Sequence, residues 1–152
     1  MQHLEIVIMS TVIRRAEQTD FDPVLQLLSL SNLTTSGLVE DAALVLVATG
    51  ADGVAACAAI EADGADALLR SVAVASSHRG SGLGTKLVLG MEDEARTLGI
   101  QRLYLLTTTA EGFFEKLGYR RVERERVPGV VRASAEFSAC SSAGATAMCR
   151  NL

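Results

Sequence analysis

The stretch that decides the fold is LLRSVAV at 68–74, followed after three residues by HRGSGLG at 78–84. The first part predicts a β-strand, and the second places three glycines directly before a helical pattern. A strand, a glycine turn and a helix leave free backbone N–H groups at a helix N-terminus, where they and the helix dipole attract anions. The stretch predicts a phosphate-binding turn; the same letters also fit a capped turn without a ligand.

Two other phosphate-binding patterns fit this stretch poorly. A P-loop ends in G-K-[ST], whereas this chain has Gly84-Thr85-Lys86, with the last two residues in the opposite order. A dinucleotide fingerprint needs G-x-G-x-x-G after the first strand of a parallel sheet, but here the third glycine comes one residue early and several strands precede it. Neither pattern accounts for the stretch.

The flanking segments predict a mixed α/β domain with a mostly antiparallel sheet. Strands are expected at 11–15, 43–49, 54–61 and 68–74, and the last three, separated by Asp-Gly turns, form a meander. A first helix begins near Pro23, and residues 32–41 form a loop with a short helix. A long helix begins at Leu83 and ends before Gly99, with Glu92 and Arg96 spaced to pair across one turn. Further elements are expected as strands at 102–106, 119–122 and 145–150 and as helices at 111–117 and 130–137.

Composition limits the class of protein. The chain has 152 residues, of which 49% are hydrophobic and 21% charged, which is enough apolar material for one core and too little charge for disorder. A net charge of -4 argues against nucleic acid as the main partner. No apolar run approaches the roughly 20 residues that a membrane span needs. We expect one domain over 9–152.

Residues 1–8 and the cysteines leave alternatives open. The leading residues are either an extra strand or an extension outside the core fold, and we favour the extension. Cys57, Cys140 and Cys149 have no C-x-x-C spacing, so we expect neither a disulfide framework nor a metal site, and a reducing cytoplasm is the simplest setting. Three thiolates binding a thiophilic ion is the less favoured alternative, because free cysteines are commonly buried.

The strand and glycine turn resemble the acetyl-CoA signature of the GNAT superfamily of N-acetyltransferases, a strand followed by [QR]-x-x-G-x-[GA] at the start of a helix. The run FFEKLGY at 113–119 is similar to the second landmark of that superfamily, and the element order also matches. LRS at 69–71, LYLLTTT at 103–109 and ASAEF at 133–137 are similar to a subgroup associated with arsenic-resistance gene clusters.

The resemblance implies a GNAT-like fold, a mostly antiparallel twisted sheet flanked by helices, in which two parallel strands splay to form the CoA cleft. It implies acetyl-CoA as co-substrate and no metal. It places the cofactor against Val72, Ala73, Val74, Arg79, Gly80, Ser81, Gly82, Leu83, Gly84, Thr85 and Phe114. A homodimer is also a family-level expectation.

The catalytic groups are less well indicated. The superfamily often uses a tyrosine in the second landmark to protonate the departing thiolate, but this chain has Phe114 there. Water or a threonine hydroxyl remains as the acid, because a thiol with a pKa near 8.5 leaves readily. No general base is evident, since Glu111 and Glu115 are expected to be solvated on a helix.

Arg70, Thr107 and Thr109 are the candidate catalytic residues, each with a structural alternative. Arg70 interrupts an apolar strand, so it is either a clamp for a substrate carboxylate or an outward-facing residue on a half-exposed strand. The threonines end a central strand and either contact substrate or cap the following helix.

These observations favour an acetyl-CoA-dependent N-acetyltransferase acting on a small polar amine, for which an acidic amine is one option, with no nucleic-acid or membrane partner. Two rival hypotheses remain: an acyl-CoA-binding sensor that has lost catalysis, indicated by Phe114, and a thiol-based metalloid-binding protein.

Overall fold

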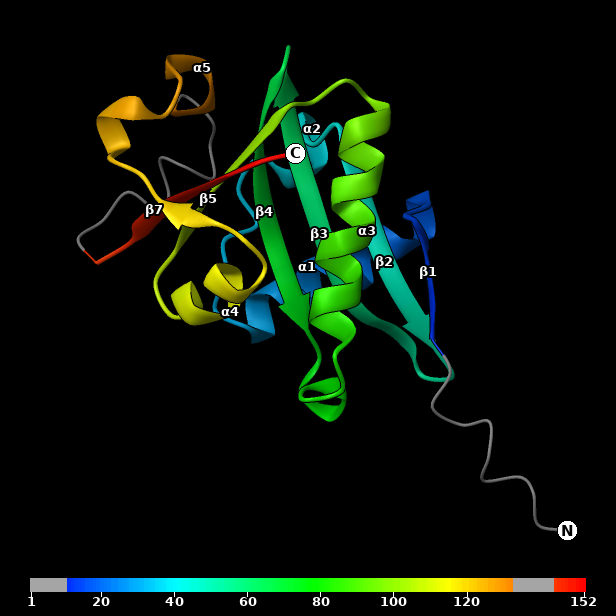
Figure 1. Cartoon of the computed structure of the whole chain (residues 1–152). Helices are drawn as coiled ribbons and strands as arrows, with labels where there is room; N and C mark the ends of the chain where they lie inside the picture. The colour runs from blue at the N-terminus through cyan, green and yellow to red at the C-terminus, as the bar shows by residue number, and fades with distance from the viewer. Residues whose placement is uncertain (1–10, 133–143) are drawn as a thin grey trace, which may run out of the picture.

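The computed structural model describes residues 11–132 and 144–152. Seven strands form one sheet in the order β1-β2-β3-β4-β5-β7-β6 (Figure 1). The strands are β1 (Val12–Arg15), β2 (Leu44–Gly50), β3 (Gly53–Asp63), β4 (Asp66–Val74), β5 (Arg102–Thr107), β6 (Arg120–Arg121) and β7 (Thr146–Asn151). The helices are α1 (Phe21–Leu30), α2 (Leu38–Asp41), α3 (Leu83–Thr97), α4 (Glu111–Lys116) and α5 (Gly129–Arg132), with short 3₁₀ turns η2 (Gln18–Asp20), η3 (Ser76–His78) and η4 (Arg124–Arg126).

The predicted meander is confirmed. Strands β2, β3 and β4 pair antiparallel in sequence order, with turns at the two expected Asp-Gly positions. The alanines of β3, poor β-formers by propensity, are buried on both faces of the sheet: Ala56 and Ala58 contact the α3 side, and Ala59 the α1 side. Small side chains at these positions let helices pack closely on both faces, so tertiary packing outweighs propensity.

Helices cover the two faces of the sheet, with α3 on one side and α1 and α2 on the other (Figure 1). On one side the core contains Leu83, Leu87, Val88 and Met91 from α3. On the other it contains Val24, Leu27 and Leu28 from α1, together with Leu38 from α2. The apolar spacing of the long helix therefore predicted its buried face, although Leu98, beyond the helix end, is 49% exposed.

The C-terminal half differs in detail from the prediction. Residues 119–122 contribute only the two-residue strand β6. The helix expected at 130–137 is the short α5, Gly129–Arg132, and the rest of that segment lies outside the described residues. The final strand is Thr146–Asn151 rather than 145–150. The leading segment 1–8 also lies outside the described residues, so its assignment stays a prediction.

One pair of neighbouring strands in this sheet, β4 and β5, is parallel, whereas the others are antiparallel. These two strands are parallel and pair only at Asp66, Ala67 and Leu68 with Arg102, Leu103 and Tyr104. Beyond Leu68 the strands separate, so the rest of β4 has no strand partner on that side. Within the described ranges, no helix is long and apolar enough to cross a membrane.

Candidate active site

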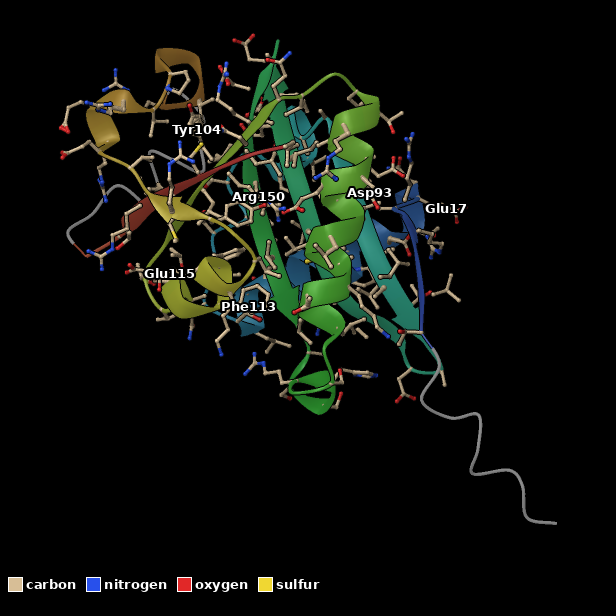
Figure 2. All side chains as sticks on the ribbon, viewed as in Figure 1. Glu17, Asp93, Tyr104, Phe113, Glu115 and Arg150 are labelled. Carbon is tan, nitrogen blue, oxygen red and sulfur yellow. The ribbon has the colours of Figure 1, made fainter. Side chains whose placement is uncertain are left out.

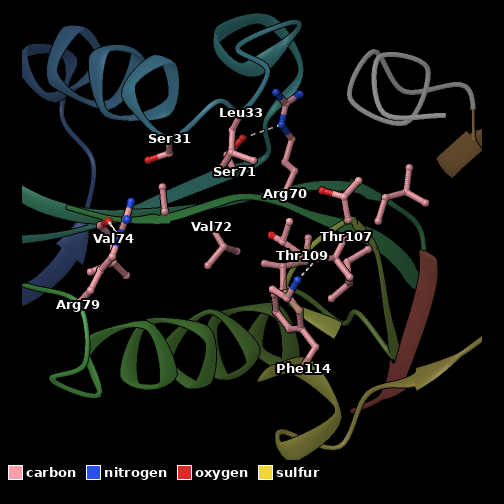
Figure 3. Close-up of a pocket in the computed structure, with 16 residues that line it drawn as sticks. Ser31, Leu33, Arg70, Ser71, Val72, Val74, Arg79, Thr107, Thr109 and Phe114 are labelled. Carbon is pink, nitrogen blue, oxygen red and sulfur yellow. Dashed lines mark hydrogen bonds between the residues drawn. The ribbon is translucent and has the colours of Figure 1, made fainter. Parts of the chain in front are cut away.

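A cleft of about 290 Å³ lies where β4 and β5 separate (Figure 3). Residues 69–74 of β4 form one wall, and residues 105–110 with Phe114 form the other. Ser31 and Leu33 from the segment after α1, together with Arg79, complete the lining. The cleft thus brings together the predicted residues Arg70, Val72, Ala73, Val74, Arg79, Thr107, Thr109 and Phe114.

The glycine turn follows β4 after the 3₁₀ turn η3 and opens α3. Gly80 and Gly82 have φ angles of 80° and 81°, a left-handed conformation that favours glycine. Gly82 is the N-cap of α3 and supplies no side chain to the first helical N–H groups. A Cβ added at either glycine would meet nothing within 4 Å, so the space beside them is open. Glycine is therefore favoured here by the backbone conformation and not by crowding.

The remaining residues of the glycine turn lie around the N-terminus of α3. Ser81, Leu83, Gly84 and Thr85 form the end of the turn and the first turn of α3, but they do not line the cleft itself. Arg79 does, and its Nε donates a 3.0 Å hydrogen bond to the carbonyl oxygen of Val74. The guanidinium therefore lies against the end of β4 rather than extending freely into solvent.

A β-bulge in β4 shapes the wall of the cleft. Ala59 pairs with Arg70 and Cys57 with Ala73, so Ser71 and Val72 together face the single residue Ala58. Ser71 has a φ of 61°, which is strained for a residue with a side chain. The extra residue reverses the alternation of side chains, so Arg70 and Ser71 lie on the same side of the sheet (Figure 3).

Arg70 is buried, which excludes the outward-facing alternative. Its Nη1 donates to Glu61 Oε2 at 2.7 Å, and its Nε donates to Ser71 Oγ at 2.9 Å. Its side chain has no exposed surface, and Nη2 has no hydrogen-bond partner among the described residues. A buried, unpaired guanidinium N–H is costly unless a ligand accepts from it.

The threonines lie in the turn between β5 and α4. Thr107 Oγ1 accepts a 2.9 Å hydrogen bond from the backbone N–H of Ala110, the N-cap residue of α4, so it stabilises this turn without capping the helical N–H groups. Thr107, Thr108 and Thr109 also line the cleft. They face residues 69–74 of β4 across the cleft.

Phe114 has an aromatic environment that fixes its position. It is 6% exposed, and its ring meets Phe113 and Tyr119 edge-to-face at centroid distances of 5.0 and 5.5 Å. The Tyr119 hydroxyl donates to Glu92 Oε2 at 2.8 Å, and burial followed by the nearby Glu92 charge raises the Tyr119 pKa. Tyr119 is therefore not placed to replace the missing acid, in agreement with its position at the start of a strand.

The predicted Glu92–Arg96 pair is wrong. Glu92 is 1% exposed and binds Tyr119 and Arg150, while Arg96 pairs with Asp93 at 3.0 Å. Glu92 follows Val88 by four residues and precedes Ala95 by three, so it belongs to the buried stripe of the helix. This spacing is the sequence signal that could have identified Glu92 as buried. A buried carboxylate in turn requires a hydrogen-bond or ion-pair partner.

The two cysteines that the structure describes, Cys57 and Cys149, do not share a site. Cys57 packs in the α1-side core, whereas Cys149 packs with Leu68 and Tyr104 in a separate cluster; Cys140 lies outside the described residues. Burial raises the pKa of Cys57 to about 12 and also raises that of Cys149, so both are thiols at neutral pH. In the described ranges, no group of three metal-ligating side chains occurs.

Comparison with known proteins agrees with this architecture. The profile of the acetyltransferase (GNAT) domain matches residues 41–121. An amino-acid acetyltransferase of Pseudomonas syringae pv. syringae is 37% identical over 81 residues, which cover 52% of this chain and 18% of that protein. This chain thus matches less than a fifth of that relative's length.

Two solved structures extend the likeness over most of the chain. Rv2747 from Mycobacterium tuberculosis, solved in complex with CoA, has a TM-score of 0.76 and 27% identity, covering 93% of this chain and 99% of that one. N-acetylglutamate synthase from Neisseria gonorrhoeae, complexed with coenzyme A and N-acetyl-glutamate, has a TM-score of 0.79 and 20% identity. The match covers 94% of this chain and 35% of that protein.

Proposed function

This chain belongs to the GNAT acetyltransferase family, and we propose that it is an acetyl-CoA-dependent N-acetyltransferase whose acceptor is a small amine carrying a carboxylate. The observation that carries the acceptor class is the buried, unpartnered Nη2 of Arg70 in the wall of the cleft. The similarity to an amino-acid acetyltransferase supports the same class. We include arsenic-containing amino acids among the candidates because of the subgroup likeness.

The residues present fit acetyl-CoA. The backbone N–H groups of residues 79–85 would hold the pyrophosphate at the N-terminus of α3, where the two left-handed glycines leave open space. Val72 and Val74 would offer backbone groups to the pantetheine arm, because β4 has no strand partner there. When bound, acetyl-CoA supplies the activated acetyl group.

Acetyl transfer would occur by direct attack of a neutral amine in a ternary complex. The amine nitrogen bonds to the thioester carbonyl carbon, the C–S bond breaks, and the proton lost by nitrogen leaves to solvent. A backbone N–H near Val72 would stabilise the oxyanion, an arrangement that is typically worth about 3 kcal/mol. Phe114 cannot protonate the departing thiolate, so water or the hydroxyl of Thr107 or Thr109 would do so.

Arg70 would bind the acceptor carboxylate through its free Nη2. Glu61 and Ser71 bind Nη1 and Nε of the guanidinium, which leaves the two N–H groups of Nη2 for a ligand. Such a geometry would orient the amine between the two cleft walls, one of which carries Val72 and the other Phe114. We also propose a cytoplasmic location, from the cysteine pattern, and a homodimeric assembly, as a family-level expectation.

A thiol-release assay over a panel of amines tests the proposal, using amino acids, their carboxamides and arsenic-containing amino acids with acetyl-CoA. Arg70→Lys should raise the KM for carboxylate-bearing amines about tenfold, since one charge-assisted hydrogen bond is lost, and leave carboxamides nearly unchanged. Arg15→Gln, which removes an exposed pair with Glu94, is the matched control. Equal KM changes for acids and amides would overturn the role of Arg70.

The alternative function is an acyl-CoA-binding sensor without catalysis, favoured by the phenylalanine at the usual acid position. Calorimetry with CoA and the thiol-release assay separate the two. Binding of CoA without thiol release for any amine supports the sensor. Absence of CoA binding would contradict both functions.

A further inference from the structure

A second pocket, of about 490 Å³, lies away from the acetyl-transfer cleft and is rich in arginine. We propose that it binds a small polyanion, a ligand that carries two or more carboxylate or phosphate groups. Four arginines, Arg102, Arg120, Arg121 and Arg126, line it, with Tyr104 and Cys149. None of these residues lines the cleft between β4 and β5, so the proposal does not depend on the proposed function.

Strand register explains why the side chains converge. Tyr104 pairs with Cys149 across β5 and β7, and Cys149 pairs with Arg120 across β7 and β6. Residues directly opposite in neighbouring strands point to the same face, so these three form one row. The Tyr104 and Cys149 residues are buried, whereas Arg120 is exposed; Arg120 also acts to lower the Cys149 pKa against the larger effect of burial.

Two of the pocket's arginines form ion pairs with carboxylates, and the other two form none with the described residues. Arg102 pairs with Asp66 at 2.7 Å, and Arg121 pairs with Glu111. Arg120 and Arg126 have no ion-pair partner among residues 11–132 and 144–152. They come from different elements, β6 and η4, so a ligand with at least two acidic groups can engage both.

The local charge opposes the overall charge of the protein. The chain carries a net charge of -4, yet four arginines and only one carboxylate, that of Glu123, line the pocket. The arginines remain in excess when Asp66 and Glu111, which pair with two of them, are also counted. Arginine presents several N–H donors in a planar fork and binds carboxylate and phosphate in two-point contacts. A pocket with two free guanidinium groups therefore favours a polyanion over a monoanion.

The pocket is also remote from the phosphate-binding turn. Tyr104 lies at the opposite end of the molecule from the turn before α3 (Figure 2). This separation allows the two anion sites to be distinguished experimentally. A probe that binds the turn should respond to Arg79, whereas a probe in the second pocket should respond to Arg120 and Arg126.

Calorimetry on the full chain tests the proposal, with pyrophosphate and citrate as probes and acetate as the monoanion. Titrations are made at low salt and repeated at 150 mM salt with CoA present. At least one polyanion should bind more tightly than acetate, and Arg120→Gln with Arg126→Gln should weaken it at least tenfold. Arg132→Gln, outside the lining, is the surface-charge control, and Arg79→Gln reports on the turn.

The probe arms identify the ligand chemistry. Binding of pyrophosphate alone indicates a phosphate ligand, citrate alone a polycarboxylate, and both a site that selects charge. The proposal fails if neither polyanion binds at millimolar concentration, if the double variant binds as the wild type does, or if only Arg79→Gln weakens binding. Circular dichroism of the double variant should be unchanged, because both arginines are exposed.

Discussion

The Cys57 thiol donates a hydrogen bond to the carbonyl oxygen of Ser71, 3.2 Å away on the neighbouring strand. Ser71 is the left-handed residue of the bulge, and its side chain accepts a second hydrogen bond from Arg70. Backbone strain of this kind persists only where surrounding contacts hold it. Cys57 and Arg70 therefore stabilise the bulge that sets the β4 wall of the cleft.

Cys57→Ala should lower kcat about two- to tenfold, because a single hydrogen bond contributes about 0.5–1.5 kcal/mol to the arrangement of the wall. The KM for acetyl-CoA should change little, since the glycine turn is untouched. Cys57→Ser retains a donor and should recover most of the rate. Cys149→Ala removes the same group from another buried cluster and should leave kcat unchanged; a loss as large as that of Cys57→Ala would contradict the role of the bulge.

Phe114→Tyr should raise kcat, because it restores a hydroxyl at the position where the family often has an acid. We expect a gain of up to about 10²-fold, at the lower end of general acid catalysis, since a thiolate already leaves well. The gain should persist until the new phenol ionises, near pH 10. Phe113→Tyr adds the same hydroxyl to the neighbouring ring and is the control. An unchanged kcat in Phe114→Tyr would show that leaving-group protonation is not limiting.

Gly82→Ala should destabilise the protein by about 1–2 kcal/mol, because φ is 81° there and L-residues are strained in that region. This corresponds to a decrease in Tm of about 2–4 °C for each kcal/mol. Affinity for CoA, measured by calorimetry, should fall as well, since the start of α3 would shift. Gly112→Ala, in α4 with open space around its Cβ, should leave CoA affinity unchanged and should not lower stability, because alanine is the better helix former. Equal effects in the two variants would contradict the requirement for a left-handed residue.

Asp20 should make stability depend on pH. Its carboxylate accepts hydrogen bonds from Arg14 at 2.7 and 3.0 Å and from the Glu17 N–H at 2.7 Å, and these contacts lower its pKa. A lowered native pKa gives stability that is present above the unfolded value, near 3.9, and is lost as the pH falls through the native value. The Tm of Asp20→Asn should be below that of the wild type at pH 7, and the difference should shrink below about pH 4.

The control for Asp20 is Asp52→Asn, in the exposed turn between β2 and β3. Thermal unfolding of the three proteins from pH 2.5 to 7 gives the comparison. If the difference in Tm between the wild type and Asp20→Asn stays constant over this pH range, Asp20 is excluded as the source of the pH dependence.

Much of the fold could be predicted because its signals are local. The two Asp-Gly turns fixed the meander, and the spacing of Leu83, Leu87 and Met91 fixed the buried face of α3. The glycine turn was found for the same reason. It requires left-handed backbone at Gly80 and Gly82, a demand that is visible in the residue type.

The remaining features depend on contacts between distant residues. No local pattern distinguishes Ser71 as left-handed, because its conformation rests on Cys57, fourteen residues earlier, and on a one-residue offset between two strands. For the same reason Arg70 was left between two alternatives, since regular alternation would place Arg70 and Ser71 on opposite faces. The partner of Glu92, Arg150, comes from the last strand of the chain.

The limited pairing of β4 with β5 gives the Glu92–Arg150 contact a mechanical consequence. The sheet consists of two parts, β1–β4 and β5–β7–β6, joined directly at three residue positions only. Glu92 belongs to the helix that packs on the first part, and Arg150 belongs to β7 in the second. The Glu92–Arg150 ion pair therefore links the two parts through a helix and a strand, in addition to the Asp66–Arg102 pair at the junction of β4 and β5. We expect it to contribute to the angle between the two parts, and hence to the width available to a thioester. Substitutions in that pair should alter which acyl chains are accepted without touching any residue of the cleft.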